Sequence, residues 1–215
     1  EVRLAPDLLT VDNRRWLSVP IRQYLNVLCI NGKPTGAALT GATETLRIAL
    51  SPTENVRGRA AVRPDVMTEN ALLEIPNLNQ YDCIFICNVR LFTAPEARRL
   101  ESYLKSGGGL VFFLGDQVQS ESYNRWLGGA DPRGVDLLPA RIGAVVTEDP
   151  GAEPLRIDPL EYRHPVVQVF RGNTAAGLLD SPIQSYMKLQ IPEGSDTKTV
   201  LAVAGGDPLI VERQV

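Results

Sequence analysis

The sequence has few of the residues on which metal and redox sites depend. Its 215 residues include one histidine, His164, and three cysteines, Cys29, Cys83 and Cys87. Zinc sites take three or four such ligands at short, regular spacings, and a fully paired disulfide framework takes an even number of cysteines. The sequence meets neither condition, so we expect no metal, no cofactor and no disulfide framework. The three cysteines are expected to be small core residues.

Positive charge and long apolar runs are also scarce. Lysine and arginine total 22 against 25 aspartates and glutamates, which gives a net charge of −3. Nucleic-acid surfaces need clustered Lys and Arg, and a membrane span needs an apolar run of roughly 18 residues. We therefore expect neither nucleic-acid binding nor direct membrane insertion by this chain. The first methionine is Met67, which leads us to expect a piece of a larger protein.

What remains is the composition of a globular domain, with 44% hydrophobic and 22% charged residues. Short apolar segments alternate with segments of helical periodicity. Strands are expected at 24–30, 61–67, 81–89 and 110–114, and helices at 39–50, 96–105 and 121–127, with a short helical piece after Thr68. This alternation predicts an α/β fold, a mostly parallel, doubly wound sheet with helices on both faces.

A central strand and the helix after it carry the clearest local signals. Residues 81–89 are apolar on both faces, as a central parallel strand requires. Thr93 and Glu96 have the spacing of a capping box, and Pro95 falls in the first turn of the helix. The glycines at 107–109 are expected to end that helix, because glycine readily adopts the left-handed backbone found there.

The pattern changes after Gly128. Prolines and glycines cluster from there to Pro159, and the end of the chain is rich in strand signals. Strands are expected at 140–146, 184–191, 199–204 and 209–212. We expect one α/β domain over 24–215 with a β-rich C-terminal part, preceded at 1–23 by a lead-in strand from an adjoining β-domain. Further sheet beyond Val215 in the parent is left open.

In open α/β sheets, ligands bind beyond the carboxyl ends of the strands, where the strand order reverses. The residues that the expected strands place there are polar or glycine. They are Asn31, Gly32, Asn88, Gly115, Asp116 and Gln117, and we call them the rim. Polar groups that converge in a pocket at the rim would bind a small polar molecule, such as a sugar or a nucleotide-like compound.

Two ionisable residues have both a functional and a structural interpretation. Asp116 at a strand-to-helix turn is a candidate general base or metal ligand, and equally a candidate cap for the following helix. His164 is a candidate acid, base or ligand. As the one histidine of the chain, placed before Pro165, it fits a structural role better. We keep His164 with the rim among the candidate ligand-binding residues.

Three segments resemble a known family. Residues 81–88 (Tyr-Asp-Cys-Ile-Phe-Ile-Cys-Asn), the capped helix at 96–105 and residues 107–116 (Gly-Gly-Gly-Leu-Val-Phe-Phe-Leu-Gly-Asp) are similar to the class I glutamine amidotransferase-like fold. They most resemble its version in large bacterial membrane proteins with von Willebrand factor A domains, of the aerotolerance-related type. The segments 12–16 and 206–213 fit the same family. The resemblance implies a soluble, flavodoxin-like α/β domain within a membrane-anchored bacterial parent.

The resemblance does not extend to catalysis. Active members of that fold hold a cysteine nucleophile on a sharp turn after a central strand, and pair it with a histidine and a carboxylate. The comparable turn here, at 115–118, holds neither cysteine nor serine, so no catalytic residue is carried over. The resulting hypothesis is a non-catalytic domain that contacts another domain of its parent chain or a partner protein. The alternative is a small-molecule-binding or hydrolytic domain that uses the rim.

Overall fold

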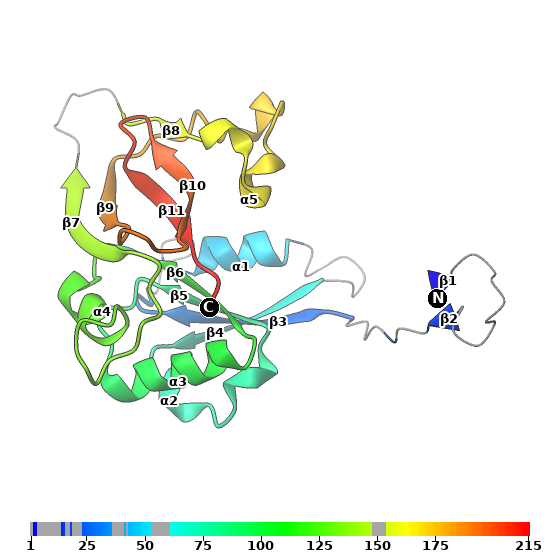
Figure 1. Cartoon of the computed structure of the whole chain (residues 1–215), viewed down its shortest axis with the longest axis vertical. Coiled ribbons are helices and arrows are strands. Elements are labelled where there is room, and N and C mark those ends of the chain that lie inside the picture. Colours follow the sequence, from blue (N-terminus) through cyan, green and yellow to red (C-terminus); the bar gives the residue numbers. More distant parts are fainter. Residues whose placement is uncertain are drawn as a thin grey trace.

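A parallel sheet with helices and a β-rich C-terminal part make up the molecule (Figure 1). The computed structural model describes residues 2–3, 14–15, 18, 23–35, 41, 43–52, 61–147 and 154–215. The sheet is formed between residues 25 and 113, and antiparallel strands follow it. The predicted α/β class and the predicted β-rich C-terminal part are therefore confirmed.

The four strands of the main sheet run parallel to one another. In chain order they are β3 (Leu25–Asn31), β4 (Val62–Thr68), β5 (Cys83–Cys87) and β6 (Gly109–Phe113). Across the sheet their order is β4-β3-β5-β6. The connection out of β3 therefore runs to one side and the connections after β4 run to the other. The strand order reverses between β3 and β5, which is where this architecture places ligands.

Helices cover both faces of this sheet, as right-handed crossovers in opposite directions require. α1 (Glu44–Leu50) lies on one face, and α2 (Ala71–Glu74) and α3 (Ala94–Lys105) lie on the other (Figure 1). A 3-10 turn, η1 (Leu78–Gln80), leads into β5, and α4 (Ser120–Trp126) follows β6.

The first helix differs from its prediction. It begins at Glu44, and none of its residues is buried; Leu46 is half-buried and Ala49 is exposed, although both were expected on an inward face. Leu39 and Ala42 lie outside the described residues. The physical reason is position: this short helix packs near the edge strand β4, whose own side chains are largely exposed.

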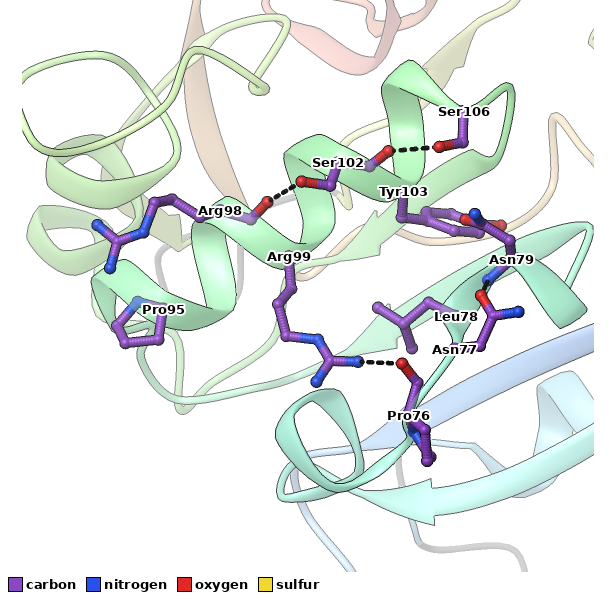
Figure 2. A pocket seen from close by; sticks show the side chains of 10 residues that line it. All are labelled: Pro76, Asn77, Leu78, Asn79, Pro95, Arg98, Arg99, Ser102, Tyr103 and Ser106. Atoms are coloured by element: carbon purple, nitrogen blue, oxygen red, sulfur yellow. Dashed lines mark hydrogen bonds between the residues drawn. The ribbon is translucent and has the colours of Figure 1, made fainter.

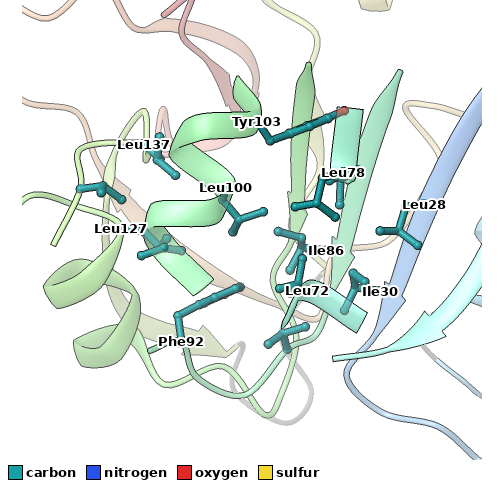
Figure 3. Close-up of a cluster of buried hydrophobic side chains, with 14 of the residues drawn as sticks. Leu28, Ile30, Leu72, Leu78, Ile86, Phe92, Leu100, Tyr103, Leu127 and Leu137 are labelled. Atoms are coloured by element: carbon teal, nitrogen blue, oxygen red, sulfur yellow. The ribbon is translucent and has the colours of Figure 1, made fainter. Parts of the chain in front are cut away.

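The main core lies between the sheet and the helices α2, α3 and α4 (Figure 3). Alternate residues of the central strands point into it, as the two-residue period of a strand dictates. Fully buried examples are Leu28, Ile30, Ile84 and Ile86. The chain after α4 turns back and adds a further group of buried side chains. These are Val135, Leu137, Leu138 and Ile142.

The start and end of α3 are as the sequence predicts. The Glu96 carboxylate accepts hydrogen bonds from the backbone N–H of Thr93 at 2.7 Å and from its hydroxyl at 2.6 Å. Pro95 lies in the first turn. Gly107, just past the helix, has a φ of 92°, a left-handed value that glycine adopts without steric cost.

The C-terminal part contains two small antiparallel sheets. Its strands are β7 (Arg141–Thr147), β8 (Ile157–Asp158), β9 (Ser185–Gln190), β10 (Lys198–Val203) and β11 (Pro208–Glu212). β7 pairs with β9, and β10 lies between β11 and β8. Among its described residues, one short helix and two 3-10 turns accompany the strands. They are α5 (Pro165–Gln168), η2 (Leu160–Tyr162) and η3 (Thr174–Ala176).

The turn η2 has a backbone that is rare for residues other than glycine. Its three residues have φ values of 49°, 59° and 55°, and left-handed backbone costs free energy for any residue with a Cβ. The guanidinium of Arg171 donates to the carbonyl oxygens of Glu161 at 2.9 Å and Tyr162 at 3.0 Å. These bonds hold the left-handed run in place.

The C-terminal part has a hydrophobic core of its own. Its buried members are Val167, Val200 and Leu201, and half-buried residues such as Ile157 and Phe170 pack against them. At the other end of the chain, β1 (Val2–Arg3) pairs antiparallel with β2 (Arg14–Arg15). Most of the expected lead-in segment 1–23 lies outside the described residues, and the expected domain boundaries stay predictions.

Candidate functional site

One asparagine connects two of the three loops of the rim. Asn88 follows β5 and is 8% exposed. Its side-chain NH2 donates to a carboxylate oxygen of Asp116 at 2.8 Å, and its side-chain oxygen accepts from the backbone N–H of Gln117 at 3.0 Å. Its own backbone N–H donates to the carbonyl of Phe113 at 2.9 Å. Asn88 therefore ties the loop after β5 to the loop after β6.

Two glycines allow the neighbouring loops to approach Asn88 this closely. A Cβ on Gly32 would lie 2.2 Å from the carbonyl oxygen of Asn88, and one on Gly115 would lie 2.4 Å from its side-chain Cγ. Both distances are well inside van der Waals contact, so only glycine fits. Asn88 itself has a φ of 53°, a left-handed value that asparagine tolerates better than most residues.

A lysine that the sequence prediction left out of the rim completes it. The ammonium of Lys33 lies 2.5 Å from a carboxylate oxygen of Asp116. Hydrogen bonds from Lys33, and then from Asn88, lower the pKa of the Asp116 carboxyl from its usual value. The two side chains of this ion pair are 43% and 66% exposed, so solvent screens their attraction. The one signal for Lys33 in the sequence is its place directly after Gly32.

The remaining predicted rim residues bond within the same network. The side-chain NH2 of Gln117 donates to the carbonyl of Gly32 at 3.1 Å. The side-chain oxygen of Asn31 accepts from the backbone N–H of Lys33 at 3.1 Å, and Asn31 is 7% exposed. The structure thus brings all six predicted rim residues together, and the side chains of Asn88, Asp116 and Gln117 form hydrogen bonds within the rim.

Asp116 does not cap the following helix, as one interpretation of the sequence had it. α4 begins at Ser120, and the residue at its N-cap is Gln119. Asp116 lies three positions earlier, where its carboxylate bonds to Lys33 and Asn88. It is a turn residue, because the chain needs a further turn after Gly115 before the helix can start.

His164 lies in the C-terminal part. Its Nε2 contacts a carboxylate oxygen of Glu212 at 2.7 Å, and its Nδ1 accepts from the backbone N–H of Val166 at 3.3 Å. Both ring nitrogens are engaged, and the side chain is 14% exposed. Within the described part of the chain, His164 has no hydrogen bond or ion pair with a rim residue. Its geometry joins the start of α5 to the end of β11.

The three cysteines line one face of the main sheet. Cys29 pairs in register with Phe85, which lies between Cys83 and Cys87 on β5. Burial raises the pKa of the Cys29 thiol to about 11 and that of the Cys87 thiol to about 12. Since the thiolate is the reactive form of cysteine, these thiols are poor nucleophiles near neutral pH.

Over the ranges given above, no three His, Cys, Asp or Glu side chains cluster in a way that could hold a metal ion. In the same part of the chain, no helix combines the length and the apolar character that crossing a bilayer takes.

In the part of the chain that the structure describes, two hollows were found away from the rim. The larger, of about 520 Å³, is an open groove between α3 and η1 (Figure 2). The smaller, of about 120 Å³, lies in the C-terminal part beside Tyr162 and Phe170. Neither is lined by a rim residue. Sequence reasoning missed the groove, although Arg98 and Ser102 of α3 and its C-cap residue Ser106 recur every four positions, a spacing that shares one helix face.

Comparisons with protein-family models, with curated proteins and with solved structures gave no significant match.

Proposed function

We propose that this chain is a non-catalytic, glutamine amidotransferase-like α/β domain that acts by contact with protein. Its partner is another domain of a larger membrane-anchored bacterial parent, or a separate chain. The observation that supports this most is the rim. The side chains that a substrate would need there, those of Asn88, Asp116 and Gln117, are hydrogen-bonded to one another and to the neighbouring loops.

A ligand at the rim would have to displace these internal bonds. Asn88 and Asn31 are nearly buried, and leaving a buried polar group without a partner costs about 1–3 kcal/mol. Binding sites usually present polar groups that are already aimed into a pocket. The closed network therefore favours a structural role for the rim.

The chemistry of the rim supports the same proposal. The turn at 115–118 holds neither cysteine nor serine. The residue after the central strand β5 is Asn88, whose side-chain amide is neither a nucleophile nor a base. The thiols of Cys29 and Cys87 are buried with raised pKa values, and His164 is bonded to Glu212. Acyl transfer requires a nucleophile paired with a base, and none of these residues forms such a pair.

An activity assay tests the proposal. Hydrolysis of glutamine and of a simple nitrophenyl ester would be measured for the wild type and for Asp116→Ala and His164→Ala. We expect the background rate from all three proteins. Hydrolysis by the wild type that is lost in either variant would show a catalytic domain and overturn the proposal.

A second candidate function is the binding of a small polar molecule at the rim. It is favoured by one observation: the carboxylate of Asp116 and the ammonium of Lys33 lie together in partly exposed positions where the strand order reverses. A panel of sugars and nucleotides would be screened for a rise in melting temperature, with Asp116→Asn as the comparison. A rise that this variant abolishes would favour binding over the interaction role.

A further inference from the structure

The groove between α3 and η1 is long and shallow. Pro95 lies near one end of its α3 wall and Ser106 at the other, and residues 76–79 form the opposite wall (Figure 2). At a rise of about 1.5 Å per residue, this stretch of α3 is about 17 Å long. An extended peptide advances about 3.3 Å per residue. The groove therefore has the length of about five residues of extended chain.

The walls are fastened to each other, so the groove exists without a ligand. The guanidinium of Arg99 donates to the carbonyls of Leu73, at 3.0 Å, and Ile75 across the groove. Tyr103 is buried at the base, and its hydroxyl donates to the carbonyl of Tyr81 at 3.1 Å. Leu78 is buried beside it. A preformed surface loses less conformational entropy when a partner binds.

The charge of the groove is positive. Its lining includes Arg98 and Arg99 and contains no aspartate or glutamate. Among the described residues, nothing hydrogen-bonds to or forms an ion pair with the Arg98 guanidinium. The nearby acid Glu101 is already paired with Lys105 at 2.7 Å. On a chain with a net charge of −3, this local excess of positive charge favours a negatively charged partner.

The groove also carries polar groups suited to a peptide backbone. The hydroxyls of Ser102 and Ser106 donate to helix carbonyls at 3.0 and 2.8 Å, which leaves their oxygens free to accept. The side-chain oxygen of Asn77 accepts from the backbone N–H of Asn79 at 3.0 Å, which leaves the NH2 of Asn77 free to donate. An extended main chain presents both N–H donors and C=O acceptors, and the groove offers partners for each.

From this shape and charge, we propose that the groove docks an acidic, extended peptide segment of a partner protein, with Arg98 as its main charged contact. The inference rests on the proposed role in protein contact, and it names the surface and the chemistry of the partner. The open, elongated form suits a strand-like segment, whose side-chain carboxylates would meet Arg98 while its backbone meets Ser102, Ser106 and Asn77.

Fluorescence anisotropy with two labelled peptides tests the assignment. One peptide alternates glutamate and proline over six residues, and the other alternates lysine and proline. The wild type should bind the first saturably and not the second, and binding should weaken between about 0.05 M and 0.5 M salt, because salt screens exposed charges. Arg98→Glu should weaken binding roughly tenfold or more. The matched control is Arg141→Glu, an exposed arginine at the start of β7, which should leave binding within about twofold.

Three results would overturn the assignment: no saturable binding by the wild type, equal binding by Arg98→Glu, or inorganic phosphate that displaces the peptide as efficiently as unlabelled peptide does. The last would indicate a small-anion site. Circular dichroism and the melting temperature check that both variants are folded. Failure here is separable from failure of the proposed function. Absence of peptide binding would overturn only the proposal for this groove. Hydrolysis that depends on Asp116 would overturn the proposed interaction role, whether or not the peptide binds.

Discussion

At the scale of single residues, Asn88 holds two loops of the rim together. Its side chain uses both its donor and its acceptor to join the loop after β6, and its left-handed backbone brings the chain into position. Gly32 and Gly115 provide the room. The rim is closed because one amide can bond in two directions at once, which neither an aliphatic residue nor a carboxylate could do in this place.

Replacement of Asn88 by alanine should therefore destabilise the fold. The variant loses two side-chain hydrogen bonds and places an alanine in left-handed backbone, and we expect a loss of about 2–3 kcal/mol in the free energy of unfolding. Urea denaturation measures it. The matched control is Asn79→Ala: this exposed side chain has no hydrogen bond among the described residues, and its loss should stay within about 0.5 kcal/mol. Equal effects would show that the Asn88 network contributes nothing.

The buried thiols give a second prediction at this scale. With the pKa of Cys29 raised from 9.0 to about 11, the thiolate fraction at pH 8 falls about a hundredfold. Iodoacetamide should label Cys29 and Cys87 in the native protein at least that much more slowly than in urea-unfolded protein. Cys83 is half-buried and should be labelled before them. Mass spectrometry locates the label, and rapid native labelling of Cys29 would contradict the burial.

Sequence reasoning found where the rim lies but not what it does. The ends of parallel strands share one edge of a sheet, so Asn31, Asn88 and Asp116 had to come close together. Whether such groups face a ligand or one another depends on backbone angles and side-chain directions. The φ of 53° at Asn88 has no signature in the amino-acid pattern, and neither does the reach of Lys33.

At the scale of elements, α3 shows how much local chemistry can predict. The helix begins where Thr93 and Glu96 place its cap and ends before Gly107, because these signals act within a few residues. Pairing over long stretches of chain has no comparable signal. The sequence suggested β7 and β9 as strands, but not that residues 141–147 would pair with 185–190. The left-handed turn at 160–162 was also missed, because it depends on Arg171 from further along the chain.

The contribution of the α3 capping box to stability can be compared with that of an exposed ion pair on the same helix. Glu96→Ala removes both bonds to Thr93 and should lower the free energy of unfolding by about 1 kcal/mol. Glu101→Ala removes only an exposed ion pair with Lys105 and should cost about 0.3–0.5 kcal/mol. Chemical denaturation of both variants gives the comparison. A larger loss in Glu101→Ala would contradict the capping role.

At the scale of the whole molecule, two cores of unequal size support the fold. Among the described residues, the core beside the main sheet contains twenty buried side chains and the C-terminal core contains three. Apolar side chains of β7 and β9, those of Ile142, Met187 and Leu189, pack against the main core, and polar contacts also link the two parts. Arg213 bonds to the carbonyl of Asp136 at 2.9 Å, and the hydroxyl of Thr197 donates to the carbonyl of Pro139 at 2.7 Å. Since apolar burial is the main stabilising contribution, the smaller core should open first.

Hydrogen exchange followed by mass spectrometry measures this difference. Amides of β3 and β5 should exchange slowest, through global unfolding, because both strands are paired on both sides. Amides of α5 and η3 should exchange at least tenfold faster, through local opening, as sparsely packed segments do. The β10 amides should lie between them. Equal protection in α5 and β5 would show that the two cores unfold as one unit.

The position of the main core along the chain has a consequence for synthesis on the ribosome. All four parallel strands lie between residues 25 and 113, so the sheet can assemble while later residues are still being made. Its hydrophobic core is incomplete at that stage, because Leu137, Leu138 and Ile142 belong to that core and are made later. Chains fold from the N-terminus as they emerge. A nascent chain that stalls between residues 113 and 142 would therefore display an unfinished apolar surface, and this is the interval in which we expect chaperones to hold it.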